Sequence, residues 1–265
     1  MARDHQGITV HTIRPVHQSG QAFYASLPCD AEIPEGHGTS GGGARHRLVC
    51  VLWEHLVTMG SPAWQSRFSA GKDALPIQVV RDPLGKPHLL LGEYRGPAIS
   101  FSEGGRTVWA AISGDESDIG IDVAGAGEFR GDYPLHRVFN AEELQHVMKL
   151  AGWDVARASA LLWSIKEAAV KALGCGFHLV EPRDISVRPA AEGDDQYTSA
   201  VCLSSKALAR LPMCAGRSIW VRSLPQGEMW LSIAFLNRQP RKAAGGGVTT
   251  PVPRINEMRI HGKRR

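Results

Sequence analysis

One apolar segment that carries charged side chains constrains the fold of this chain more than any other. Residues 154–173 contain no proline, open on an aspartate that can cap a helix, and are followed by Gly174, which can end one. Glu167 and Lys171 are four residues apart and share a helix face, with Lys166 beside them. Much of the rest of the helix is apolar, so we expect it to be largely buried, with partners for its charges. A surface ion pair between Glu167 and Lys171 is the simpler alternative.

A second charge in an apolar setting lies upstream. Residues 118–124 have the pattern of an apolar strand, and Asp122 is a carboxylate inside it. Two carboxylates that face each other would repel, and each would be costly to bury alone. A cation shared by Asp122 and Glu167 removes both costs, so the pattern favours a metal site at this point.

Composition limits the classes of protein that fit. A chain of 265 residues with 43% apolar and 21% charged residues can bury a proper core in one large or two small domains. Five cysteines without a C-x-x-C pair indicate reduced thiols in a cytoplasmic protein. The chain starts without a signal-peptide pattern and has no apolar run long enough to span a bilayer, so we expect no membrane partner.

The charge is distributed unevenly. Residues 241–265 carry seven Lys or Arg and one Glu, a charge of +6, whereas the whole chain carries +4. The first 240 residues therefore carry −2, which argues against a nucleic-acid-binding body. The basic segment is rich in Gly and Pro, so we expect residues 241–265 to be a disordered tail.

The order of expected elements repeats along the chain. A strand, a helix and several short strands are followed by a second strand, two helices and several short strands. We expect strands at 8–16, 76–80, 88–91, 98–102, 107–113, 118–124, 184–189, 198–204, 217–224 and 228–236, and helices at 44–59, 141–151 and 154–173. This order predicts an α+β fold of two similar halves with a cleft between them, residues 1–117 and residues 118–240.

Two glycine patterns partly match nucleotide-binding motifs. Gly36, Gly38 and Gly41 match G-x-G-x-x-G, but no strand precedes them. The glycines of residues 125–131 follow a strand, but their spacing is one residue too long and Pro134 disrupts a helix start there. A nicotinamide-dependent enzyme is therefore a minor alternative.

Basic residues at the start of the first helix suggest an anion site. Arg45 and Arg47 lie where the helix dipole disfavours positive charge. They become favourable if an anion binds at this helix start. A solvated helix start is the alternative.

Three segments together resemble the 4′-phosphopantetheinyl transferase superfamily, in its larger surfactin-synthetase-activating (Sfp) type. They are I-G-I-D at 119–122, F-x-x-x-E at 139–143 and W-S-I-K-E-A-A-V-K at 163–171, of which the last is the most specific. Weaker matches are Gly-Lys-Pro at 85–87 and Ile-Ser-Phe-Ser at 99–102, where the family keeps G-K-P and N-x-S-H-S. The likeness covers roughly residues 44–236.

The resemblance implies a pseudo-twofold tandem of two α/β subdomains, each a small, mainly antiparallel sheet with a long helix. Coenzyme A binds in the cleft, and its phosphopantetheine arm moves to a serine of an apo acyl or peptidyl carrier protein with release of 3′,5′-ADP. By the same resemblance Mg²⁺, with Mn²⁺ as an alternative, is expected on Asp122 and Glu167. Glu143 is the expected base, and Lys166 and Lys171 are expected to act on the phosphates. The residues expected to bind coenzyme A are Arg45, Arg47, Lys86, Pro87, Ser100, Ser102, Asp122 and Lys171. A chain that supplies both sides of its own cleft is expected to be a monomer.

Two departures from the family pattern weaken the match. Ala124 replaces the usual second acid, whose place water, Glu116 or Glu128 could fill. Phe101 replaces the histidine, unless a slipped register brings Glu103 there. A catalytically weak module that binds coenzyme A or carrier protein is therefore the alternative function.

Overall fold

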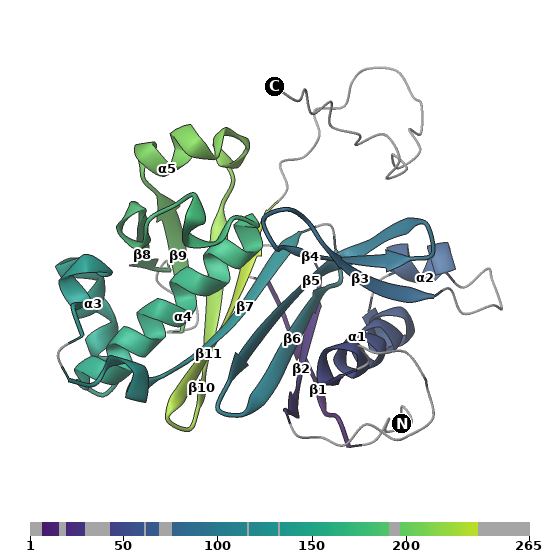
Figure 1. Ribbon diagram of the computed structural model, residues 1–265, viewed down its shortest axis with the longest axis horizontal. Helices are drawn as coiled ribbons and strands as arrows, with labels where there is room; N and C mark the ends of the chain where they lie inside the picture. Colours follow the sequence, from purple (N-terminus) through teal and green to yellow (C-terminus); the bar gives the residue numbers. More distant parts are fainter. Residues whose placement is uncertain are drawn as a thin grey trace, which may run out of the picture.

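The computed structural model describes residues 7–15, 20–29, 43–60, 62–68, 76–115, 117–131, 133–190 and 197–237 (Figure 1). The expected basic tail at 241–265 lies outside the described residues, as does the glycine pattern at 36–41.

The first half is a six-stranded antiparallel sheet covered by a helix. Its strand order is β1-β2-β6-β5-β4-β3, with β1 Val10–Ile13, β2 Ala22–Pro28, β3 Ile77–Arg81, β4 Pro87–Leu91, β5 Tyr94–Gly104 and β6 Thr107–Ser113. Helix α1, Ala44–His55, continues as a π-helical turn at Leu56–Gly60, and the short α2 spans Pro62–Phe68. Leu48 and Leu52 of α1 pack on Phe23, Ile99 and Ile112 of the sheet, which forms the first core.

The second half is a five-stranded antiparallel sheet covered by the long helix. Its order is β7-β11-β10-β9-β8, with β7 Asp118–Gly125, β8 Ile185–Pro189, β9 Thr198–Leu203, β10 Ile219–Gln226 and β11 Met229–Leu236. The helices are α3 Ala141–Met148, α4 Val155–Leu173 and α5 Ser205–Arg210. Short 3-10 helices span Ala126–Phe129, Leu135–Arg137, Gly176–His178, Pro182–Asp184 and Pro212–Cys214.

Helix α4 approaches β7 unusually closely. A Cβ atom added at Gly120 would meet the backbone oxygen of Ala168 at 1.9 Å and the nitrogen of Ala172 at 2.6 Å. Only glycine leaves room for this contact, so the glycine of the I-G-I-D segment sets the distance between the helix and the strand that carries Asp122.

The two sheets meet through a third core. Tyr24 and Trp109 of the first sheet pack against Ile119, Ile121 and Phe235 of the second. Helices α1 and α4 lie on opposite sides of the molecule, with the sheets between them (Figure 1). The expected α+β fold of two halves, each an antiparallel sheet with a helix, is therefore confirmed.

The division at residues 117 and 118 and the cleft stay predictions. Residues 125–131 do not open a βαβ unit, because β7 has only an antiparallel neighbour and is followed by the 3-10 helix Ala126–Phe129.

Candidate active site

Asp122 lies at the point where β5, β7 and α4 meet. The Nζ of Lys171 donates to Asp122 Oδ1 at 2.7 Å and to the Ile121 carbonyl at 3.2 Å. From the first half, the Ser102 hydroxyl donates to the same Oδ1 at 2.9 Å. The structure thus brings together Asp122, Lys171 and Ser102, three of the residues predicted from the sequence.

The two carboxylates of the predicted metal site are electrostatically coupled. Burial raises the pKa of the Asp122 carboxyl, while the charge of Lys171 and the hydrogen bonds from Lys171 and Ser102 lower it. Burial raises the pKa of Glu167 as well, and the negative charge of Asp122 raises it further, whereas the charge of Lys171 lowers it in part. Within the described residues, the Glu167 carboxylate makes no hydrogen bond or ion pair. Glu167 therefore has unused acceptor oxygens near a buried anion, an arrangement that favours a cation.

These residues fit a divalent cation with few protein ligands. No group of three or more His, Cys, Asp or Glu among the described residues is arranged to hold a metal. Mg²⁺ is commonly held by one or two carboxylates plus water and substrate phosphates, which Asp122 and Glu167 can supply in part. Glu128 is near enough for its charge to raise the pKa of Asp122, and its Oε1 accepts from the Gly125 N–H at 2.8 Å. Glu116 lies outside the described residues.

Two serines of β5 join the halves. The Ser100 and Ser102 hydroxyls accept hydrogen bonds from the backbone N–H groups of Ile121 (3.1 Å) and Val123 (3.2 Å), on the free edge of β7. Side chains alternate along a strand, so Phe101 points the other way, into the core under α1. The register thus places Ser102 beside Asp122.

Arg45 has a partner within the first half. Its Nε and Nη2 donate to Glu103 Oε1 at 3.1 and 2.7 Å, and its guanidinium lies 5.9 Å from the centroid of the Phe101 ring. Both side chains of this ion pair are about half exposed. Arg47 lies in the same turn of α1. No described contact joins Arg45 to Asp122, so its role toward coenzyme A stays a prediction.

Lys166 lies in the interior of the second half rather than beside Asp122. Its side chain is 0% exposed, and its Nζ donates to Glu143 Oε1 at 2.6 Å, to the Val138 carbonyl at 3.1 Å and to the Pro182 carbonyl at 2.8 Å. These three bonds use all three N–H donors of the ammonium. Burial lowers the pKa of Lys166, whereas the adjacent Glu143 raises it.

Glu143 is equally enclosed. It is the third residue of α3, and its Oε1 also accepts from the backbone N–H of Asn140 at 2.8 Å, which closes a capping box. Its Oε2 accepts from the N–H of Val187 on β8 at 3.1 Å. The carboxylate thus ties α3, α4 and β8 together, and its role as a base stays a prediction.

Lys86 and Pro87 lie at the turn into β4. The Nζ of Lys86 donates to Asp118 Oδ1 at 3.0 Å and to the Ala172 carbonyl at 2.9 Å, in the second half. No sequence motif singles out Asp118, and its position as the first residue of the strand that carries Asp122 is the one available signal.

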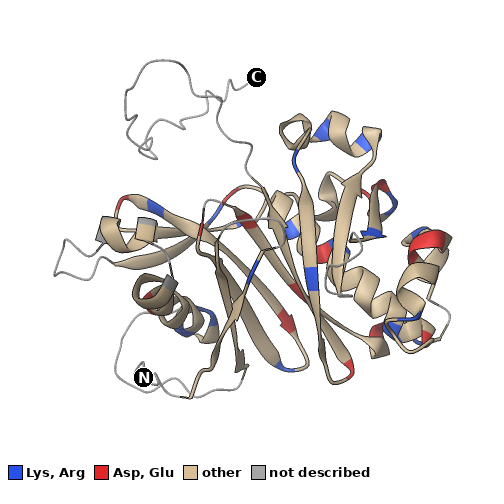
Figure 2. Ribbon diagram, turned by 180° about the vertical axis from the view of Figure 1, so that it is seen from behind, with Lys and Arg blue, Asp and Glu red and all other residues tan. Residues whose placement is uncertain are grey.

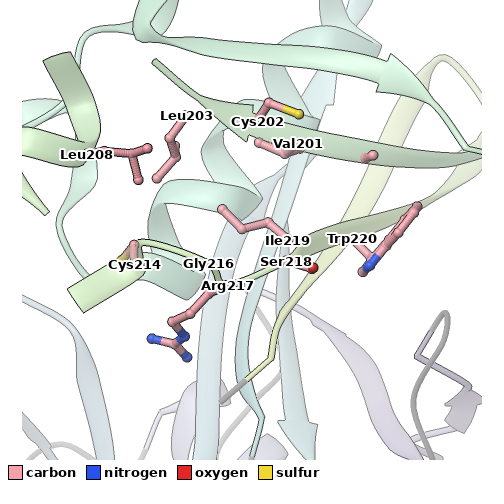
Figure 3. A pocket seen from close by; sticks show the side chains of 11 residues that line it. Val201, Cys202, Leu203, Leu208, Cys214, Gly216, Arg217, Ser218, Ile219 and Trp220 are labelled. Carbon is pink, nitrogen blue, oxygen red and sulfur yellow. The ribbon is translucent and has the colours of Figure 1, made fainter. Parts of the chain in front are cut away.

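A cavity elsewhere in the second half contains none of the predicted site residues (Figure 3). It lies between β9, β10 and the segment from α5 to residue 218, and its volume is about 230 Å³. Its lining is mainly apolar, with Val201, Leu203, Leu208 and Ile219. The cavity is therefore not the site built around Asp122.

Charged residues of both signs are spread over the described part of the chain (Figure 2). Acidic and basic residues occur on both halves of the molecule (Figure 2). No helix in the described ranges is long and apolar enough to cross a membrane.

Comparison with known proteins identifies the family. The family model described as the 4′-phosphopantetheinyl transferase superfamily matches residues 118–209, which include Asp122, Glu143 and the whole of α4. A holo-[acyl-carrier-protein] synthase of Verminephrobacter eiseniae is 37% identical over 99 residues, 35% of this chain and 74% of that protein.

Slightly less than half of this chain is also similar to each of two solved structures. One is the Chronobacterium ammoniagenes ACPS–CoA complex, with 20% identity and a TM-score of 0.40 over 48% of this chain and 100% of that one. Another is the Helicobacter pylori holo-[acyl-carrier-protein] synthase in complex with coenzyme A, with 17% identity and a TM-score of 0.37. The match covers 45% of this chain and 99% of that one.

The identity to the curated relative extends over most of that protein, and the matched residues contain the Asp122 and α4 segments that form the site. The larger Sfp type stays a prediction. The chain belongs to the 4′-phosphopantetheinyl transferase superfamily and is a phosphopantetheinyl transferase.

Proposed function

We propose that this protein transfers the 4′-phosphopantetheine arm of coenzyme A to a serine of an apo acyl or peptidyl carrier protein. The reaction depends on Mg²⁺, with Mn²⁺ as a substitute, and releases 3′,5′-ADP. The observation that carries the proposal is the meeting of Asp122, Glu167 and Lys171 at the contact between β7 and α4. The name of the Verminephrobacter eiseniae relative supports the choice of carrier protein.

The reaction places specific demands on the site. The serine oxygen forms a bond to the phosphorus that bears the pantetheine arm, and the bond from that phosphorus to the 3′,5′-ADP oxygen breaks. The serine proton leaves to a base or to solvent. Negative charge grows on the departing phosphate, so fixed positive charge beside the pyrophosphate accelerates the step. When bound at Asp122 and Glu167, the divalent ion supplies part of that charge.

Lys171 is the better placed of the two predicted lysines. Its side chain is 30% exposed, whereas that of Lys166 is 0% exposed. An ammonium is a compact charge suited to phosphate. Lys171 favours the ionised form of the buried Asp122 through the 2.7 Å ion pair, against the effect of burial, and it reaches solvent where a pyrophosphate can approach. Lys171 therefore meets the phosphate in our proposal, and Lys166 supports α4 from within.

Two groups can accept the proton of the carrier serine. The family pattern implies Glu143, whose oxygens accept hydrogen bonds from Lys166, Asn140 and Val187 in this conformation. Glu143 must exchange one of these donors to take the serine proton. Transfer of the proton to a solvent molecule near Asp122 is the competing assignment.

The nucleotide end of coenzyme A is assigned to the first half. We place its 3′-phosphate at Arg45 and Arg47, since guanidinium groups bind phosphate well. The phosphate must compete with Glu103 for Arg45. A single chain supplies both halves of this site, which supports a monomer. The cysteines are free thiols, and this supports a cytoplasmic location.

A direct test uses intact-protein mass spectrometry. Apo carrier protein is incubated with coenzyme A, Mg²⁺ and either the wild-type enzyme or the Asp122→Ala or Glu167→Ala variant. We expect a mass gain of one phosphopantetheine arm with wild type, none in EDTA, and none with either folded variant. Wild-type rates in a variant, or transfer that survives chelation, would refute the assigned site.

Ala124 and Phe101, which replace an acid and a histidine of the family pattern, favour a second candidate function. That candidate is a weakly catalytic module that binds coenzyme A or carrier protein. Coenzyme A binding without any mass gain on the carrier would support it.

A further inference from the structure

Partly buried ionic contacts join the two halves at the C-terminal end of α4. Lys86 belongs to the first half, whereas its partners Asp118, at the start of β7, and Ala172, in the last turn of α4, belong to the second. The side chains of Lys86 and Asp118 are 11% and 15% exposed. Such enclosed charges are stable only when they are paired.

Arg217 completes the pairing of Asp118. Its Nη2 donates to Asp118 Oδ2 at 3.1 Å, and its Nε donates to the Asn237 carbonyl at 2.6 Å. Each oxygen of Asp118 therefore has its own cation, one from each half of the chain. We refer to Lys86, Asp118 and Arg217 as the inter-half clamp.

The stem of Lys86 fits against the end of the helix. Gly174 ends α4 in the left-handed conformation, with φ +79°, and a Cβ atom there would meet the Cδ of Lys86 at 2.6 Å. The last carbonyls of a helix carry partial negative charge, so an ammonium beside Ala172 stabilises this end. The first half thus supplies a cap for a helix of the second half.

The inter-half clamp holds the two elements that carry the candidate active site. Asp118 is on the strand of Asp122, and Ala172 directly follows Lys171. On the basis of the function proposed above, we propose that Lys86 is a positioning residue. Through the inter-half clamp it sets the end of α4, and with it Lys171 and Glu167, against Asp122, and it is not a ligand of coenzyme A.

The two possible roles of Lys86 predict opposite effects of Asp118→Asn. If Lys86 binds a phosphate of coenzyme A, Asp118 competes for its ammonium, and the variant should bind coenzyme A more tightly. If Lys86 belongs to the clamp, the variant should share the effects of Lys86→Met. Both variants should then loosen the end of α4 and lower the rate of transfer.

The experiment compares four variants of the full chain. Lys86→Met and Asp118→Asn break the inter-half clamp, and Lys86→Arg keeps its charge. Lys206→Met is the matched control, since Lys206 is 50% exposed and pairs with Glu181 and Asp184, outside the inter-half clamp. Hydrogen exchange at residues 170–175 is measured without coenzyme A. Calorimetry then gives the coenzyme A Kd, and the carrier assay gives kcat and KM.

The expected results separate positioning from binding. Exchange should be roughly tenfold faster in Lys86→Met and Asp118→Asn, as expected when a helix-end charge contact is lost. Their kcat should fall while the Kd stays within about twofold of wild type, an insignificant free-energy change. Lys86→Arg should recover most of kcat, and Lys206→Met should match wild type.

Unchanged exchange in both clamp variants, or tighter coenzyme A binding by Asp118→Asn, would overturn the proposal. The isosteric Asp118→Asn keeps the test decisive if Lys86→Met does not fold. Absence of transfer by the wild-type chain would contradict the proposed function instead, because the exchange measurement does not depend on turnover.

Discussion

Replacing Lys166 by Met should destabilise the protein far more than removing any exposed lysine. The Lys166 side chain is 0% exposed. Methionine can occupy much of the same volume, so the main loss is that of the charge. The substitution leaves the buried Glu143 carboxylate with two backbone N–H donors and without its counter-charge. It also leaves the carbonyls of Val138 and Pro182 without their donor.

The size of this loss follows from the burial of the pair. Removing one partner of a buried ion pair costs about 3–5 kcal/mol, because the other charge stays buried and uncompensated. For a domain of this size each kcal/mol lowers Tm by about 2–4 °C, so we expect a fall of roughly 6–20 °C. Lys206→Met removes a solvent-exposed lysine and should leave Tm close to that of wild type, because exposed ion pairs contribute little to stability.

Thermal and urea unfolding followed by circular dichroism measure both variants. Adding Glu143→Gln to Lys166→Met removes the stranded charge, so the double variant should be more stable than the sum of the two single losses predicts. A loss below about 1 kcal/mol in Lys166→Met would refute this reasoning, because such a value is typical of solvated pairs.

Three further predictions test the site. Glu143→Gln, assayed where the variant is folded, should lower kcat by roughly 10²-fold or more with little change in coenzyme A affinity; near-normal turnover would assign the base role to solvent. Arg45→Ala with Arg47→Ala should raise the KM for coenzyme A and spare 3′-dephospho-coenzyme A, whereas equal losses for both substrates would remove the 3′-phosphate from this helix start. The pKa of Glu167 is raised above its ordinary value of 4.5, so the metal-free wild type should lose stability as pH rises from 4.5 through that raised pKa. Glu167→Gln should therefore be more stable than wild type at pH 7 and equal to it in stability below pH 4.5. Urea unfolding in EDTA checks this, and a less stable variant at pH 7 would contradict it.

The elements that the sequence predicted well have strong local signals. Helix α4 begins after Asp154, whose side chain accepts from two backbone N–H groups, and ends at Gly174 in the left-handed conformation, as expected. Strand β6 has its expected bounds, Thr107–Ser113. Strand β2 was not predicted. It lies inside the first sheet and is buried on both faces, so it lacks alternation, and it ends at Pro28.

The site was predictable where its residues share one strand or one helix face. The family resemblance at residues 99–102 and the carboxylate in the apolar pattern of residues 118–124 brought Ser102 and Asp122 into consideration, and the structure places them in contact. The sequence did not separate Lys166 from Lys171. Five residues place them about 140° apart on a helix, so packing decides which one is enclosed. The partner of Lys86, Asp118, is 32 residues away along the chain, a contact for which no local pattern exists.

The stoichiometry of the two products tests the proposed transfer most directly. Wild-type enzyme, coenzyme A, Mg²⁺ and apo carrier protein are incubated, and samples are divided between nucleotide chromatography and intact-protein mass spectrometry. We predict one 3′,5′-ADP released for each carrier serine that gains the arm, with neither product formed when that serine is replaced by alanine. Release of 3′,5′-ADP without modified carrier, or a modified carrier without 3′,5′-ADP, would contradict the transfer.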